Sequence, residues 1–296
     1  TFTNVESAFS HGSGEGTVVT MSDFAVNDAR ESCFNFAPNT VATLTGTASN
    51  PSTMTNCNTN NKDWAGAIAS DETGSTAGSL TMSYVNIVDS KVSAIKTDLQ
   101  MVTISDVTVT TPNIGNQYRW TDTSWSFDNT GVSLGLSHGL NSEVEITNFD
   151  APNYGQGWIC AASKVSLTNV NLGTGFHTDH RFDIDPYCGA VQSVGSMGAN
   201  SVFDTVTAAN MAMYRTFPGT ANNIQVTNDF KIAELGVAGG STDTVAFDSL
   251  SVGGLFEVSS CGSDVELTDS TVGRIDSLCG TFGETSAVRM DDSTIV

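Results

Sequence analysis

One eight-residue pattern recurs along most of this sequence and limits the folds open to it. In each copy, apolar residues alternate with others, two polar residues interrupt the alternation, and the alternation then resumes. Val102–Val109 (VTISDVTV) and Val165–Leu172 (VSLTNVNL) are two clear copies. Such alternation indicates short strands with one buried face, and the polar pair indicates a bend between them. Further copies begin near Val19, Leu80, Val144, Ser201, Ile224, Val245, Val265 and Val288.

The interval between copies defines the length of the repeat. From Leu80 onward, successive copies begin 22, 42, 21, 36, 23, 21, 20 and 23 residues apart. One unit is therefore about 21 to 22 residues long, which is typical of solenoids, in which each unit packs on the next. The 42-residue interval predicts one further copy that the pattern does not reveal. The 36-residue interval predicts one unit with a loop insertion at about residues 175–186.

An Asp or Asn residue occupies the polar pair in many copies, which predicts a sharp corner between two strands. Both residue types tolerate the left-handed backbone angles that such a corner requires. Stacked in neighbouring repeats, their side chains could also hydrogen-bond to one another as a ladder. The predicted corner residues are Asp23, Asp106, Asn148, Asn169, Asn228, Asp269 and Asp292.

Two other folds fit the pattern less well. Leucine-rich repeats need a Leu-x-x-Leu-x-Leu consensus and a helical return, whereas the returns here are rich in Gly, Ser and Thr and show no amphipathic helix. A β-sandwich would place its strands roughly 8 to 12 residues apart without this common phase. The pattern therefore favours a solenoid of strands.

The bent-strand pattern with its Asn or Asp corner resembles the right-handed parallel β-helix superfamily, the fold of pectate lyases and phage tailspikes. The resemblance covers roughly residues 17–296 and concerns the shape of the repeat, not a catalytic motif. It implies an all-β chain that forms a single β-helix domain over residues 1–296, with about 12 to 13 coils of 20 to 23 residues. Since each coil adds one strand spacing, the rod would be about 60 Å long.

Six cysteines form three pairs that are local in the sequence, which favours structural disulfides over six buried free thiols in the cytosol. No CxxC, CxxCH or zinc-finger spacing occurs, so redox motifs, covalent haem and zinc ribbons are not expected. Coils about 4.8 Å apart would bring stacked cysteines within disulfide range. Disulfides predict an oxidising compartment, so we expect an extracellular or cell-surface location. The predicted pairs are Cys33 with Cys57, Cys160 with Cys188, and Cys261 with Cys279.

The formal net charge of −21 over 296 residues excludes several classes of partner. Only 11 Lys and Arg residues face 32 Asp and Glu residues. A field of this sign repels phosphate backbones and anionic lipid surfaces, so no nucleic-acid partner is expected. No run approaches the roughly 18 apolar residues of a membrane span, so no membrane insertion is expected.

The densest cluster of polar side chains lies in the predicted insertion. Insertions on a rigid scaffold often carry function. The two histidines there could bind a transition metal with a neighbouring aspartate, whereas the later aspartates resemble half of a calcium loop. The alternatives are a solvated loop in which Arg181 neutralises the aspartates, and a loop that binds a partner. The candidate ligands of a divalent cation are His177, Asp179, His180, Asp183 and Asp185.

No catalytic set of the β-helix enzymes is complete in this sequence. Polygalacturonase-like members carry Asn-Thr-Asp, Asp-Asp, Gly-His-Gly and Arg-Ile-Lys in that order. Here His138 lies in Ser-His-Gly, which matches the Gly-His-Gly element only in part. Asp291-Asp292 comes after this His instead of before it. Arg274-Ile275 is followed by Asp instead of Lys. With 11 cations in the whole chain, the basic groove of a lyase is not expected either. We therefore assign no catalytic residue and do not expect an enzyme.

The expected function is that of an extracellular structural or adhesive β-helix, as a subunit or segment of a filament, surface layer or adhesin. Neither end shows a capping helix, which predicts head-to-tail stacking of the chain with itself, or contacts with neighbouring surface proteins. One alternative is a carbohydrate-active β-helix, similar to a lyase or a hydrolase, that uses the insertion on a polysaccharide. Another is a tailspike-like receptor-binding module.

The metal hypothesis predicts one stoichiometric ion in the purified protein by elemental analysis. His180→Ala should remove it, because the site would lose one of its few ligands. His11→Ala, far from the insertion in the sequence, is the control and should keep the ion. If His180→Ala leaves the metal content unchanged, or if the unmodified protein carries no ion, the solvated loop is the better description.

Overall fold

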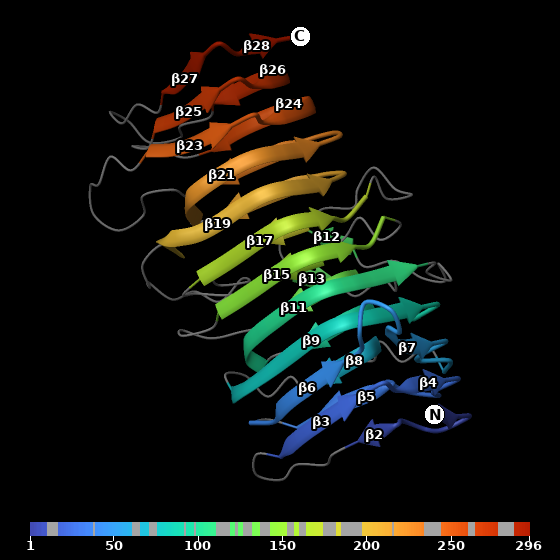
Figure 1. The fold of residues 1–296 in the computed structure, drawn as a ribbon. Coiled ribbons are helices and arrows are strands. Elements are labelled where there is room, and N and C mark those ends of the chain that lie inside the picture. The colour runs from blue at the N-terminus through green and yellow to red at the C-terminus, as the bar shows by residue number, and fades with distance from the viewer. Residues whose placement is uncertain are drawn as a thin grey trace.

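In the computed structural model, every regular element is a β-strand in the residues that the structure describes. Twenty-six of these strands form one sheet. Figure 1 shows labelled strands of this sheet stacked in chain order from β2 near the N-terminus to β28 at the C-terminus. No described segment is a helix long and apolar enough to cross a membrane. The all-β class is therefore confirmed. The described residues are 1–10, 17–37, 39–60, 66–70, 76–91, 93–97, 99–110, 119–121, 124–126, 132–136, 143–152, 157–159, 164–173, 182–184, 197–214, 216–233, 244–259, 264–277 and 287–296.

The described strands of the large sheet pair in parallel, and the pairings form three series. The first consists of β3 (Val18–Ser22), β6 (Val41–Thr45), the N-terminal parts of β9 (Thr76–Val88), β11 (Leu99–Thr110), β15 (Glu143–Asp150), β17 (Lys164–Asn171), β19 (Met197–Ala208) and β21 (Thr216–Val226), and then β23 (Thr244–Asp248), β25 (Asp264–Thr268) and β27 (Val288–Asp291).

The second series consists of β1 (Phe2–Thr3), β4 (Ala25–Asn27), β7 (Ser52–Thr55), the C-terminal parts of β9, β11, β15, β17, β19 and β21, the first residues of β24 (Ser251–Ser259) and β26 (Thr271–Ser277), and β28 (Thr294–Ile295). The third consists of β2 (Phe9–Ser10), β5 (Phe34–Phe36), β8 (Gly66–Ser70), β10 (Ser93–Thr97), β14 (Val132–Leu136), β16 (Gly157–Ile159), β18 (Phe182–Ile184), β20 (Met211–Tyr214), β22 (Phe230–Ala233) and the last residues of β24 and β26. Along the chain, the three series follow one another in turn.

The pairing register has the same period as the repeat in the sequence. Val144 pairs with Val165, 21 residues later, and Val265 pairs with Val288, 23 residues later. Each residue therefore lies beside its counterpart in the next repeat. A slip by one residue would move every inward side chain to the outer face, so the apolar alternation fixes this register.

The core is built from rows of inward-facing side chains that this register brings together. One row joins neighbouring strands from β6 to β19, and each of its members is at most 1% exposed. Burying a side chain of this size contributes about 1.5 to 3 kcal/mol. Packing between successive repeats is therefore the main stabilising interaction. The members of the row are Leu44, Met82, Ile104, Ile146, Leu167 and Phe203.

The predicted corner residues lie between the first and second series, and six of them have left-handed backbone angles. Their φ values lie between 46° and 54°. Asp and Asn tolerate this region better than other residues with a Cβ atom. The prediction is confirmed for Asp23, Asp106, Asn148, Asn169, Asp269 and Asp292.

The seventh predicted corner, Asn228, is wrong. The corner of that repeat is Asn223, with φ 48°, and Ile224 after it pairs with Val206 in the second series. The predicted copy that begins at Ile224 is therefore one strand out of phase with the pairing. Other repeats place Tyr84 and Thr205 at the same corner, with φ of 52° and 58°. Strand pairing imposes the left-handed angle even on residues that resist it.

The further copy predicted within the 42-residue interval is also wrong. Val102 pairs directly with Val144, so no additional strand of the first series lies between β11 and β15. The described part of this interval holds β14 and an antiparallel pair formed by β12 (Arg119–Thr121) and β13 (Ser124–Ser126). The first series has eleven described strands, fewer than the 12 to 13 coils expected.

We predict that Thr205→Asn stabilises the protein by about 1 kcal/mol. Thr is β-branched and disfavours a positive φ, whereas Asn tolerates it and keeps an acceptor for Asn223, which donates to the Thr205 hydroxyl over 3.2 Å. Urea unfolding followed by circular dichroism measures the effect. Thr207→Asn, two residues on within the strand, is the matched control and should give no gain, because Asn is a poor strand former. An equal gain at both positions would contradict the explanation.

Candidate functional site

The predicted metal ligands lie almost entirely outside the residues that the structure describes. His177, Asp179, His180 and Asp185 are outside them, and only the backbone of Asp183 is placed, in strand β18. That strand pairs with β16 and β20, and Ile184 in it is buried. Phe182–Ile184, within the predicted insertion 175–186, is thus part of the sheet. Among the described residues, no three His, Cys, Asp or Glu side chains gather as a metal site would require.

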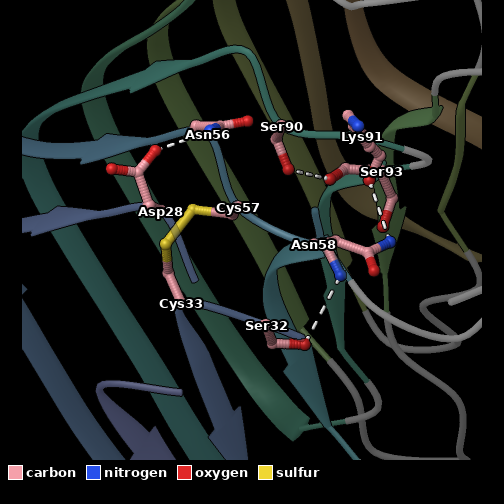
Figure 2. Close-up of a disulfide and its surroundings, with 10 residues drawn as sticks. Asp28, Ser32, Cys33, Asn56, Cys57, Asn58, Ser90, Lys91 and Ser93 are labelled. Atoms are coloured by element: carbon pink, nitrogen blue, oxygen red, sulfur yellow. Dashed lines mark hydrogen bonds between the residues drawn. A yellow bond between two sulfur atoms is a disulfide. The ribbon is translucent and has the colours of Figure 1, made fainter. Parts of the chain in front are cut away.

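The first predicted disulfide is confirmed. Cys33 and Cys57 are bonded, their Cα atoms are 5.4 Å apart, and both are fully buried. Figure 2 shows the bond joining two neighbouring levels of the stack. Next to the bond, the amide of Asn58 donates to the carbonyl of Glu31, and the amide of Thr59 donates to the carbonyl of Ala29. The bond therefore fastens repeats that backbone hydrogen bonds already join. Cys160, Cys188, Cys261 and Cys279 lie outside the described residues.

Side-chain amides form the predicted ladder along part of the corner. Asn148 donates to Asp106 over 2.9 Å, and Asn169 donates to Asn148 over 2.9 Å. These bonds run along the stack from one repeat to the next. A second column lies beyond the second series, where Asn56 donates to Asp28 over 2.6 Å. Both columns engage their polar groups internally, which favours a structural role for them.

Two serines that replace apolar residues after the corner have a structural explanation. Ser270 is buried, accepts the amide of Leu250 over 3.0 Å and donates to the carbonyl of Thr268 over 2.8 Å. The amide of Ser270 in turn donates to the hydroxyl of Ser293 over 2.9 Å. The hydroxyls therefore satisfy backbone groups that would otherwise be buried without partners.

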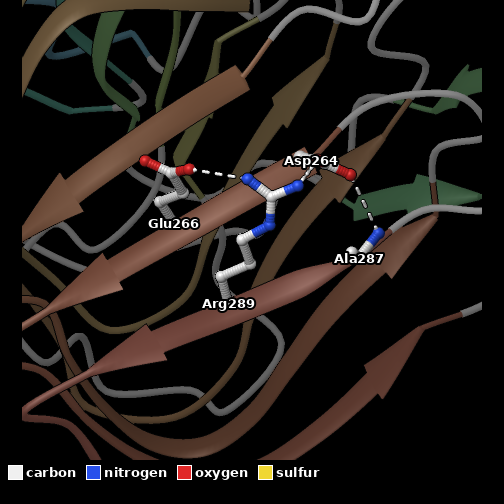
Figure 3. Close-up of polar contacts among 4 residues, drawn as sticks. All are labelled: Asp264, Glu266, Ala287 and Arg289. Carbon is white, nitrogen blue, oxygen red and sulfur yellow. Dashed lines mark hydrogen bonds and ion pairs between the residues drawn. The ribbon is translucent and has the colours of Figure 1, made fainter.

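Several outward side chains at the C-terminal end of the first series are charged. Arg289 on β27 contacts Asp264 over 2.7 Å and Glu266 over 3.1 Å, both on β25 (Figure 3). The arginine side chain is 62% exposed. Exposed pairs of this kind contribute little to stability. They give this end of the sheet a highly polar surface.

The N-terminal end of the same series presents a different surface, which we call the hydroxyl face. It consists of the outward side chains of four adjacent strands, β3, β6, β9 and β11. Each is exposed or half-buried. None is charged, although the chain carries a net charge of −21. The twelve residues are Val18, Thr20, Ser22, Val41, Thr43, Thr45, Ser79, Thr81, Ser83, Met101, Thr103 and Ser105.

The hydroxyl face is ordered in rows. Thr20, Thr43, Thr81 and Thr103 pair successively across the four strands. A parallel row of Ser and Thr begins at Ser22 and continues over β15 and β17 to Thr168. The third row contains Val18, Val41 and Met101, which are 74%, 43% and 41% exposed. Two rows of hydroxyl groups therefore lie beside one mainly apolar row over a regular, uncharged area.

Sequence reasoning missed this face, although the Thr-x-Ser and Thr-x-Thr triplets were visible. Their intervals of 23, 38 and 22 residues conceal that they lie side by side. No protein-family model, curated protein or solved structure matches this chain.

We predict that peptide mapping without reduction recovers three disulfide-linked peptide pairs. Cys33–Cys57 should be recovered together with Cys160–Cys188 and Cys261–Cys279, because residues one coil apart approach within disulfide range. Mapping after reduction and alkylation is the control and should release all six cysteines as separate peptides. Free thiols in the native protein at the last two pairs would remove most of the argument for an oxidising compartment.

Proposed function

We propose that this chain is an extracellular right-handed parallel β-helix with a structural or adhesive role, as a subunit or segment of a filament, surface layer or adhesin. The observation that carries the proposal is the in-register pairing of eleven described strands in the first series. At its N-terminal end, in β3, β6, β9 and β11, it produces rows of similar, uncharged outward residues. Such rows suit attachment to a repetitive surface, at many weak contacts at once.

The order of the strand series supports a helical winding. The chain passes from β3 to β4 to β5 and then returns to β6 beside β3. One circuit therefore visits the three series once, as a coil with three faces would. Connections between parallel strands of one sheet are right-handed in nearly all proteins. We therefore propose a right-handed coil that repeats along the chain.

The extracellular location is supported by the buried Cys33–Cys57 bond, since disulfides persist in oxidising compartments. The acidic composition supports it further, because counterions in salty water screen the repulsion among the carboxylates. Rows of hydroxyl groups and ladders of amides suit adhesion by hydrogen bonding. The described polar groups of the ladders are already engaged in the stack, which leaves the hydroxyl face as the surface for attachment.

Self-association is supported by the edges of the stack. Among the described pairings, β27 and β28 bond on one side only, as do β1, β2 and β3 at the other edge. Ile295 is 55% exposed and Val296 is 83% exposed, and Met290 is half-buried. A second copy stacked head to tail would pair these edges and cover the apolar side chains. Each Å² of apolar surface covered contributes roughly 25 cal/mol, before the cost of association.

This proposal predicts that the protein polymerises and that Met290→Asp with Ile295→Asp converts the polymer into monomers. The two carboxylates would be forced against the apolar groups of the next copy. Sedimentation velocity measures the mass, and circular dichroism checks that the strands remain. Ser251→Asp with Thr271→Asp, which adds the same charge at exposed positions one or two levels inside the stack, is the control and should still polymerise. Sedimentation of the unmodified protein as a monomer at high concentration and high salt would contradict self-association.

A further inference from the structure

We propose that the hydroxyl face, the outward side chains of β3, β6, β9 and β11, binds the surface of ice. The inference rests on the proposed adhesive role and names the surface to which the protein adheres. Three properties of the face carry it, namely its two-dimensional regularity, its mixture of hydroxyl and methyl groups, and its freedom from charge.

The first property is regularity. Backbone pairing spaces neighbouring strands by about 4.8 Å, and alternate residues along one strand are about 6.7 Å apart. The two hydroxyl rows run in register across all four strands, from Thr20 to Thr103 and from Ser22 to Ser105. The oxygen atoms in the surface planes of hexagonal ice repeat at similar intervals in two directions. A regular array of this kind can therefore hold water molecules at several lattice positions together.

The second property is the chemistry of each contact. A Thr hydroxyl donates and accepts hydrogen bonds as a water molecule does, and its methyl group can occupy a hollow of the lattice. The branched Thr side chain has few rotamers on a strand, so little entropy is lost when it binds. Thr20 and Thr103 are exposed, and Thr43 and Thr81 are half-buried between neighbouring strands. The row is therefore both accessible and held in place.

The third property is neutrality. A charged side chain orders water around itself in a geometry that ice does not have. The hydroxyl face has no charged residue, whereas the same outward positions carry Glu143 and Glu145 on β15 and Lys164 on β17. Such a face offers no charge that could pair with an ion, which fits a crystal of water as its partner.

The size of the face also argues against a protein partner. Four strands of five residues cover about 14 Å by 13 Å, far less than the roughly 800 Å² that a stable protein interface needs on each side. An ice surface offers an equivalent binding position at every lattice step. A small face that dissociates can therefore bind again at a neighbouring position. In a head-to-tail polymer, many copies of the face would act together.

The test is partition of the purified protein into slowly growing ice, together with inhibition of ice recrystallisation. The unmodified protein should concentrate in the ice fraction. Thr43→Tyr and Thr81→Tyr should each lower this partition at least ten-fold, because a bulky ring at the centre of the array prevents flat contact. Tyr is a good strand former, so the fold should persist. Circular dichroism and the melting temperature check this.

The matched control is Thr271→Tyr, which places the same ring at an exposed position on β26, far along the stack. It should leave the ice partition unchanged. Exclusion of the folded, unmodified protein from ice overturns the proposal, as does an equal loss in Thr271→Tyr. Binding to crystalline cellulose or chitin that Thr81→Tyr abolishes, without ice activity, also overturns it and assigns the face to a neutral polysaccharide. Failure of polymerisation would appear separately, as monomers in sedimentation that still partition into ice.

Discussion

Parallel hydrogen bonding between strands one repeat apart places each residue beside its counterpart in the next repeat. Val144, for example, pairs with Val102 on one side and with Val165 on the other. The core, the corner ladders and the surface rows all depend on this register, because each is a column of equivalent positions. In a fold with side chains alternating between two faces, one slipped residue would exchange buried for exposed groups along a whole strand.

The same register requires a particular backbone conformation at every corner. The chain must turn sharply from the first series into the second without losing pairing, and it does so through a left-handed residue. Where that residue is Asn148 or Asn169, the side chain also bonds to the neighbouring repeat. Where it is Thr205, packing of the strands on both sides outweighs the local preference. Local strain is tolerated because the repeats before and after it are firmly paired.

Stacking also joins single outward residues of neighbouring strands into extended surfaces. A Thr or Ser at one outward position is unremarkable by itself, but pairing assembles four of them into a row from Thr20 to Thr103. At the opposite end of the series, the equivalent positions carry Glu266 and Arg289, which pair with each other. The outward side chains of the first series are thus uncharged in β3, β6, β9 and β11 and include ion-paired charges in β25 and β27.

The sequence alone determined the features that are local in it. The period, the alternation of buried and exposed residues, the corner at Asp106 and the Cys33–Cys57 bond follow from residues within about one repeat of each other. Only the tertiary structure decided which strands are neighbours when loops of unequal length intervene, as in the direct pairing of Val102 with Val144 and the shift of one corner to Asn223. The physical reason is that two strands pair when they are in contact in space. The number of residues in the loop between them does not determine which strands pair. The hydroxyl face was hidden for the same reason, since its rows exist only once the strands are stacked.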